Sequence, residues 1–344
     1  MRDNLSLYER EAESRRISIL GVPLELGSDE RGFSEAPRYL LEHGLENMLT
    51  SLGMEVTGTQ MVPCRQPERV VSAGSAKYID EIVAAARVSH TLVQKAAERG
   101  EMVLALGGDH SMAIGTIAGA ASTHSSLGVI WIDAHADANT YETTLSGNVH
   151  GMPAAALMGF GHPFLTGIGG NAQKVRPENF LYIGLKDIDA QEIEFLRRES
   201  VKTVTMFDIA ERGLSRAVLA IDALRRKVGT VWVSMDMDSI DKEYAPGVGM
   251  PNEGGLTRRE VLHLAQYIGK TCKLAGLDIV EIVPAKDREK KTATLALELA
   301  ARFLGGEHGW YENYMQEYRS TNVTKRRELQ RVRPYDGKRT TTDS

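Results

Sequence analysis

Short apolar runs alternate along the chain with longer segments whose apolar residues recur every three or four positions. The short runs have the composition of buried strands, and the longer segments have the spacing of amphipathic helices. Strands are predicted at 16–20, 54–62 (at a sheet edge), 102–106, 129–132, 180–184, 201–206, 231–235 and 273–282. Helices are predicted at 37–45, 75–99, 111–122, 151–159, 190–200, 215–227 and 292–304, and another after Thr257, where Glu260 completes a capping box. This alternation predicts a parallel sheet with helices on both faces.

Polar residues at alternate positions follow the apolar run 129–132, namely Asp133, His135 and Asp137. On an extended backbone alternate side chains point the same way, so we expect these three to converge on one point. A single polar residue at this place would indicate only that the end of the strand is exposed to solvent. Three of them favour a ligand site at the carboxyl end of the strand, where open α/β sheets bind their ligands.

Two further strand ends carry the same kinds of residue. Asp236 and Asp238 follow one apolar run, and His110 follows another through Gly107 and Gly108, which we expect to let the backbone turn so that His110 faces inward. Four carboxylates and two imidazoles cannot crowd together without cations. The pattern therefore predicts two divalent metal ions bridged by carboxylates, with a hydroxide between them. Oxygen and imidazole ligands without thiolate suit Mn, Co, Ni, Fe or Zn.

Composition narrows the class of protein. The 344 residues are 42% hydrophobic and 25% charged, as in an ordinary globular protein. A net charge of -5 gives no reason to expect nucleic acid or an acidic membrane as partner. The two cysteines, Cys64 and Cys272, indicate neither a disulfide framework nor a cysteine zinc site. Because 1–16 is polar and no stretch has the length and apolarity of a membrane span, we expect a cytoplasmic protein.

Four motifs occur in a fixed order: Gly-Gly-Asp-His ending at His110, Asp-Ala-His-Ala-Asp from Asp133, Ser-Gly-Asn-Val-His-Gly around His150, and Ser-Met-Asp-Met-Asp ending at Asp238. As a set they make the chain resemble the ureohydrolase superfamily of arginases and agmatinases. The resemblance covers about 17–306 and implies a single-domain three-layer α/β/α fold with a mostly parallel central sheet. We expect 1–16 to be an N-terminal extension and 307–344 a polar, basic tail.

The resemblance also implies how the metal ions are held. One ion would be bound by His110, Asp133, Asp137 and Asp236, and the other by Asp133, His135, Asp236 and Asp238. Asp133 and Asp236 would bridge the two ions. Mn is the metal we expect first, and Ni, Co and Fe stay open.

Glu281 points to a cationic substrate, because it ends an apolar strand and a buried carboxylate there needs a cation. A planar guanidinium is the best bidentate partner, and an internal salt bridge is the structural alternative. By resemblance Glu281 anchors the guanidinium, His150 protonates the departing amine, and Asp137 belongs to the catalytic set. The reaction implied is the hydrolysis of a guanidino compound to urea.

Residues at arginase-like positions favour L-arginine, which would give urea and L-ornithine. By resemblance the α-carboxylate would be bound by Asn139, Thr144 and Ser146, and the α-amino group by Asp189 and, less directly, Glu192. Agmatinases normally lack the Thr-x-Ser-Gly-Asn loop. The family also implies a homotrimer or a homohexamer.

Three departures from the usual arginase residues keep other substrates and functions open. Met250 stands where arginases usually have Thr, Val283 where they have Asn, and Lys186 where they have Arg. Met250 removes a hydroxyl near the glutamate and adds bulk. The alternatives are the same hydrolysis of another guanidino or amidino compound, such as agmatine, guanidinobutyrate, formiminoglutamate or a modified arginine, and a weakly active regulatory protein.

Overall fold

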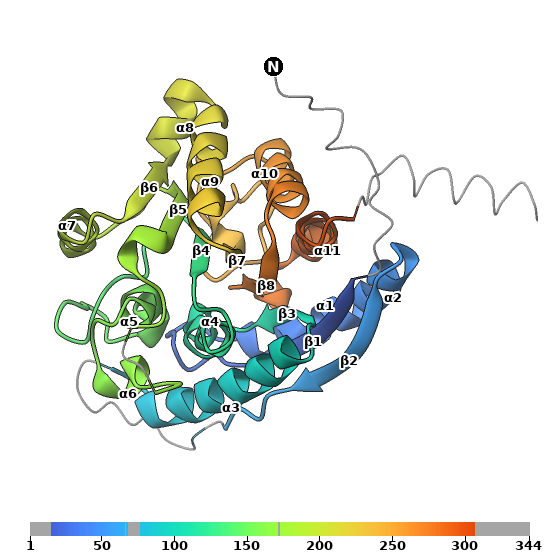
Figure 1. Cartoon of the computed structure of the whole chain (residues 1–344), viewed down its shortest axis with the longest axis horizontal. Coiled ribbons are helices and arrows are strands. Elements are labelled where there is room, and N and C mark those ends of the chain that lie inside the picture. Colours follow the sequence, from blue (N-terminus) through green and yellow to red (C-terminus); the bar gives the residue numbers. More distant parts are fainter. Residues whose placement is uncertain (1–14, 66, 68–75, 171–172, 307–344) are drawn as a thin grey trace, which may run out of the picture. The chain divides into compact units, whose positions relative to one another are not determined.

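The computed structural model describes residues 15–65, 67, 76–170 and 173–306. These residues contain one sheet, with the strand order β2-β1-β3-β8-β7-β4-β5-β6 (Figure 1). All pairs of neighbouring strands are parallel. The strands are β1 (Arg16–Val22), β2 (Glu55–Met61), β3 (Met102–Gly107), β4 (Leu127–Ile132), β5 (Phe180–Leu185), β6 (Lys202–Thr205), β7 (Thr230–Asp236) and β8 (Leu274–Val280). The predicted parallel sheet is confirmed, with β2 at its edge.

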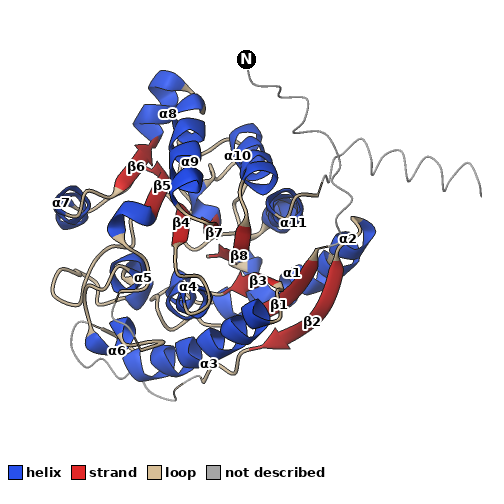
Figure 2. Cartoon of the chain, in the orientation of Figure 1, coloured by secondary structure: helices blue, strands red, loops and turns tan. Residues whose placement is uncertain are grey.

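Helices cover both faces of this sheet and make it the middle of three layers (Figures 1 and 2). One face packs against α1 (Ala36–Glu42), α2 (Leu45–Ser51), α8 (Met206–Arg212), α9 (Ser215–Lys227), α10 (Arg258–Thr271) and α11 (Lys291–Phe303). The other face packs against α3 (Ile79–Glu98), α4 (Ala113–Ala121), α5 (Pro153–Leu157), α6 (Pro163–Thr166) and α7 (Ala190–Arg198).

Strand β4 shows why the apolar runs form buried strands. Its side chains alternate between the two cores, so Ile130 and Ile132 join one and Val129 and Trp131 join the other. Every residue of β4 is buried. A strand that is buried on both faces needs a continuous apolar run, and this is the pattern seen in the sequence.

Several predicted elements differ in their bounds. The helix predicted at 37–45 is two helices, because Gly44 between α1 and α2 has a φ of 94°. The helix predicted at 151–159 is only the short α5. Helix α8 is not among the predicted elements: the strand predicted at 201–206 includes its first residue, Met206, and no element is predicted for the rest of it. Helix α9 is confirmed at its predicted bounds, and the capping box of Thr257 and Glu260 is present.

None of the helices among the described residues is long and apolar enough to cross a membrane. Most of the predicted N-terminal extension and the whole predicted tail (1–14 and 307–344) lie outside the described residues. The bounds of the three predicted segments stay a prediction.

Candidate metal centre and substrate pocket

Four neighbouring strands, β3, β8, β7 and β4, bring the candidate residues together at their carboxyl ends. Ile132 of β4 pairs with Met235 of β7, so the next residues, Asp133 and Asp236, lie side by side. His110 follows β3 and Glu281 follows β8. Residues separated by up to 171 positions in the chain therefore meet at one sheet edge.

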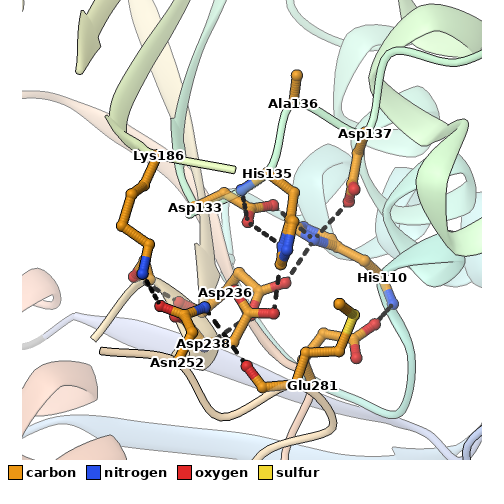
Figure 3. Close-up of polar contacts among 12 residues, drawn as sticks. His110, Asp133, His135, Ala136, Asp137, Lys186, Asp236, Asp238, Asn252 and Glu281 are labelled. Carbon is orange, nitrogen blue, oxygen red and sulfur yellow. Dashed lines mark hydrogen bonds and ion pairs between the residues drawn. The ribbon is translucent and has the colours of Figure 1, made fainter. Parts of the chain in front are cut away.

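The first group surrounds one ring nitrogen of His110 with carboxylates (Figure 3). Nδ1 of His110 lies 3.3 Å from Asp133 Oδ2, 3.0 Å from Asp137 Oδ2 and 3.0 Å from Asp236 Oδ2. The His110 ring is fully buried and stacks on Trp131, with ring centroids 4.1 Å apart. These four residues offer ligand atoms within 4.8 Å of one another.

The second group is Asp133, His135 and Asp238. Nδ1 of His135 lies 3.3 Å from Asp238 Oδ2 and 3.5 Å from Asp133 Oδ1. Asp133 belongs to both groups, as expected of a bridging carboxylate. Asp236 lies in the first group only, and its bridging role stays a prediction.

The residues present fit divalent cations. The buried atoms His135 Nε2 and Asp238 Oδ1 have no hydrogen-bond partner, and His110 Nδ1, although close to three carboxylates, makes no well-oriented hydrogen bond to any of them. Burial and the charge of Asp133 raise the pKa of Asp137 to about 6, and burial with Asp238 and Asp133 raises the pKa of Asp236 well above its usual range. Buried atoms without partners and crowded carboxylates are both stabilised by bound cations.

The backbone that creates this convergence is not the extended one we predicted. Strand β4 ends at Ile132, and Asp137 has a left-handed φ of 48°. Asp238 lies in a 3-10 turn, Met237–Ser239, whose start is capped by Asp236. The three alternating residues thus converge through a folded loop. Strained backbone of this kind is characteristic of functional sites.

The turn expected at the Gly107–Gly108 pair is present, since the backbone bends at Gly108, but it does not use a conformation that only glycine adopts. Neither glycine has a positive φ. Glycine is needed at Gly108 because a Cβ there would lie 1.7 Å from the carbonyl oxygen of Leu24. Asp109 then turns back and accepts a hydrogen bond from the amide of Gly27 at 2.7 Å. Close packing of the end of β1, rather than a turn that only glycine allows, aims His110 inward.

Ser234 and Asp278, which are not among the predicted site residues, support His110 from behind. Nε2 of His110 is 2.9 Å from Ser234 Oγ, and Ser234 donates to Asp278 at 3.3 Å. Asp278 also accepts hydrogen bonds from Trp232 and Thr116. An acidic residue within the apolar run of β8 was the available signal, because a buried carboxylate needs donors.

A cavity of about 240 Å³ lies next to the two groups. It is lined by His135, Asp137, Asn139, His150, Gly151, Asp187, Asp189, Glu192, Asp236, Asp238, Met250 and Glu281. Nδ1 of His150 is 3.1 Å from Glu281 Oε1. Burial lowers the pKa of His150, but Glu281 outweighs it and the net pKa is raised to about 9. A protonated His150 beside a carboxylate suits a proton donor.

The residues predicted to bind the α-carboxylate and α-amino group of the substrate divide into two sets. Asn139 donates to Asp189 at 3.0 Å, and Glu192 accepts from the amides of Ala138 and Asp189, so these side chains form one hydrogen-bonded wall of the cavity. Thr144 and Ser146 are not among its described lining residues and accept hydrogen bonds within their own loop. Asp187, which is not among the predicted site residues, also lines the cavity.

A parallel α/β sheet whose strand ends carry two acidic, imidazole-containing groups beside a polar cavity defines a hydrolase of the ureohydrolase class. The arginase family model matches residues 15–305. An arginase of Bacillus caldovelox is 40% identical over 294 residues, which are 84% of this chain and 98% of the relative. The chain belongs to the arginase family.

Solved structures agree with this assignment. A structure of the Bacillus caldovelox arginase at pH 5.6 superposes with a TM-score of 0.81 at 38% identity, covering 86% of this chain and 99% of that one. An arginase of Entamoeba histolytica, solved in complex with L-ornithine, gives a TM-score of 0.79 at 27% identity, with 85% and 99% covered. The family predicted from the motifs is confirmed.

Proposed function

We propose that this protein hydrolyses L-arginine to urea and L-ornithine. One observation carries the proposal: the metal-suited groups, the buried carboxylate of Glu281 and the Asn139–Asp189 wall all face the same cavity. A substrate with a guanidinium at one end and an amino-acid head at the other would meet complementary groups at both ends. The related Entamoeba histolytica arginase was solved with L-ornithine, the amino-acid product of this reaction.

The two cations would be held by His110, Asp133, Asp137 and Asp236 and by Asp133, His135 and Asp238. When bound, they lower the pKa of water so that it becomes a nucleophile at neutral pH. We propose Mn²⁺ as the native metal, because carboxylate and imidazole ligands suit it; Ni²⁺, Co²⁺ and Fe²⁺ would fit the same donors.

The other residues bind the substrate and move its protons. The negative charge of Glu281 pairs with the guanidinium, and His150, 3.1 Å from Glu281, donates a proton to the departing amine. Asn139 and Asp189 receive the α-carboxylate and α-amino groups. Glu192 serves the α-amino group less directly, by accepting a hydrogen bond from the amide of Asp189. Thr144 and Ser146 would contribute to carboxylate binding from their own loop.

A second candidate substrate is another guanidino or amidino compound, and Met250 is the observation that favours it. Met250 lines the cavity where the motif usually has Thr. A weakly active regulatory protein is disfavoured, because all six predicted ligands are present and meet in two groups. We also propose a cytoplasmic homotrimer or homohexamer, as the family resemblance implies.

The test is urea release from a panel of guanidino compounds by protein reconstituted with Mn²⁺ and, separately, with Ni²⁺. The panel contains L-arginine, agmatine, guanidinobutyrate and homoarginine. Formiminoglutamate is also tested, and its hydrolysis is measured through its own product instead of urea. The highest kcat/KM for L-arginine supports the head-group assignments. Activity confined to compounds without an α-amino acid head would contradict the roles of Asn139 and Asp189 and leave the metal groups intact.

A further inference from the structure

We infer that Lys186, acting through Asn252, is a positioning residue that fixes Met250 as the wall for the aliphatic chain of the substrate. This pair would then set which chain length the cavity accepts. The inference rests on the proposed function, because it concerns the same cavity and the same class of guanidino amino acids.

Met250 is distinctive because the rest of the cavity is polar. Among the described residues that line it, Met250 is the only large apolar side chain, and it is 50% exposed. A guanidino amino acid has polar ends, which the carboxylates and amide of the cavity can bind, and an apolar chain of methylene groups between them. The unbranched thioether of Met250 is the available partner for that chain.

Lys186 holds the segment that follows Met250. Its ammonium group donates to Oδ1 of Asn252 at 2.6 Å and to the carbonyl oxygen of Glu253 (Figure 3). The side-chain amide of Asn252 donates in turn to the carbonyl oxygens of Met250, at 3.4 Å, and of Asp238, at 3.3 Å. Lys186 therefore joins the loop after β5 to the Met250 segment and to the turn that carries the metal ligand Asp238.

The other end of the segment is held independently, against Glu281. The amide of Gly249 donates to the carbonyl oxygen of Glu281 at 3.1 Å, and the carbonyl oxygen of Gly249 accepts from Lys286 at 3.0 Å. A Cβ on Gly249 would lie 3.1 Å from Glu281 Oε2 and 2.4 Å from Phe33. Loss of the Lys186 contact would therefore release Met250 on one side while the guanidinium end of the cavity stays fixed.

This arrangement predicts an effect on binding rather than on chemistry. The energy of taking one methylene group out of water corresponds to about a fourfold change in affinity. Without a fixed wall the cavity would bind the chain less tightly and distinguish less between chains that differ by one methylene. Glu281 would be unaffected, because Gly249 holds it independently, and Asp238 keeps its direct hydrogen bond from Asn252.

The experiment measures kcat and KM of the metal-loaded full chain for L-arginine, for its analogue one methylene shorter and for L-homoarginine, one methylene longer. Lys186→Met should raise the KM for L-arginine about fivefold, leave kcat within about twofold, and reduce the preference for L-arginine over both analogues about fourfold. Lys186→Arg should retain most of the preference, since a guanidinium can donate both hydrogen bonds. Metal content and melting temperature are measured for each variant.

Two further variants isolate the route through Met250. In a Met250→Ala background, Lys186→Met should have no additional effect on the preference, because no wall remains to be positioned. Lys242→Met is the matched control: Lys242 pairs with the same loop residue, Glu253, at 2.6 Å, but both side chains are at least half exposed. It should leave the kinetics unchanged.

The outcomes separate the two proposals. No urea from L-arginine or from either analogue with the wild-type protein would overturn the proposed function itself. Normal wild-type activity with unchanged KM and preference in Lys186→Met would overturn the positioning role. An equal loss of kcat for all three substrates, or a loss of bound metal, would assign Lys186 a purely structural role and would also overturn it.

Discussion

The backbone amide of His110 donates a hydrogen bond to the side chain of Glu281, 2.8 Å away. The two residues end neighbouring strands, β3 and β8, although 171 positions separate them in the chain. Oε1 of Glu281 is occupied by this bond and by His150. A residue of the first candidate metal group thus fixes the carboxylate that we propose to bind the guanidinium, so the sheet itself sets the spacing between that group and Glu281.

Glu281→Gln tests the charge of this carboxylate. Glutamine keeps an oxygen that can accept from the His110 amide but loses the negative charge. We expect kcat/KM for L-arginine to fall about 10²–10³-fold, as when one partner of a buried charge pair is lost. Steady-state urea production measures the effect, with metal content as the control for an intact centre. Activity within about threefold of wild type would show that Glu281 does not bind the guanidinium.

Asp236→Asn should change stability in opposite directions with and without metal. In metal-loaded protein it removes a ligand, so the melting temperature should fall, because cations that bind only the folded state stabilise it. In chelated protein it removes one of four crowded buried carboxylates, so the melting temperature should rise, by about 1–2 °C for each kcal/mol of relieved repulsion in a chain of this length. Thermal unfolding in EDTA and in excess Mn²⁺ measures both signs. The same sign in both conditions would argue against metal binding by this group.

The convergence of the candidate metal ligands could be predicted from the sequence because each follows an apolar run. The carboxyl ends of parallel strands share one edge, so the strand pattern alone placed His110, Asp133 and Asp236 together. The order of the strands could not be predicted. It depends on packing between segments far apart in the chain, such as β3 against β8.

The local backbone was predicted less well, because the loops depend on tertiary contacts. The left-handed residue Asp137 and the close approach of Gly108 to Leu24 follow from neighbours that no local pattern reveals. Lys186 departs from the family pattern at its position. Its contact with Asn252 became visible only in the structure, because the two residues lie 66 positions apart.

His150→Asn tests the proton donor. Asparagine has no proton to give at neutral pH, and general acid catalysis contributes about 10²–10⁴-fold. We therefore expect kcat to fall by that factor while metal content stays unchanged, because His150 belongs to neither metal group. His263→Asn, at an exposed position of α10, is the matched control and should be fully active. A His150→Asn variant as active as this control would exclude His150 as the donor.

Glu101→Gln tests a buried ion pair that is remote from the metal ligands. The Glu101 side chain is 2% exposed and pairs with Arg16 at 3.1 Å and Arg99 at 2.6 Å. The hydrogen bond from Arg99 outweighs burial and lowers the pKa of Glu101. A carboxylate with a lowered folded-state pKa stabilises the fold above its unfolded pKa, and this stabilisation is lost as the pH falls through the folded value.

The variant should therefore be less stable than wild type by about 1–3 kcal/mol near neutral pH, as for a lost hydrogen bond to a charged group. The difference should shrink as the pH falls below about 4, the usual glutamate range, because the wild-type carboxylate then takes up its proton. Urea unfolding of chelated protein over a pH series measures this difference. Glu253→Gln, whose carboxylate is 77% exposed, is the control and should differ little from wild type at any pH. If the loss of unfolding free energy in Glu101→Gln stayed constant down to the lowest pH of the series, packing rather than charge would make Glu101 stabilising.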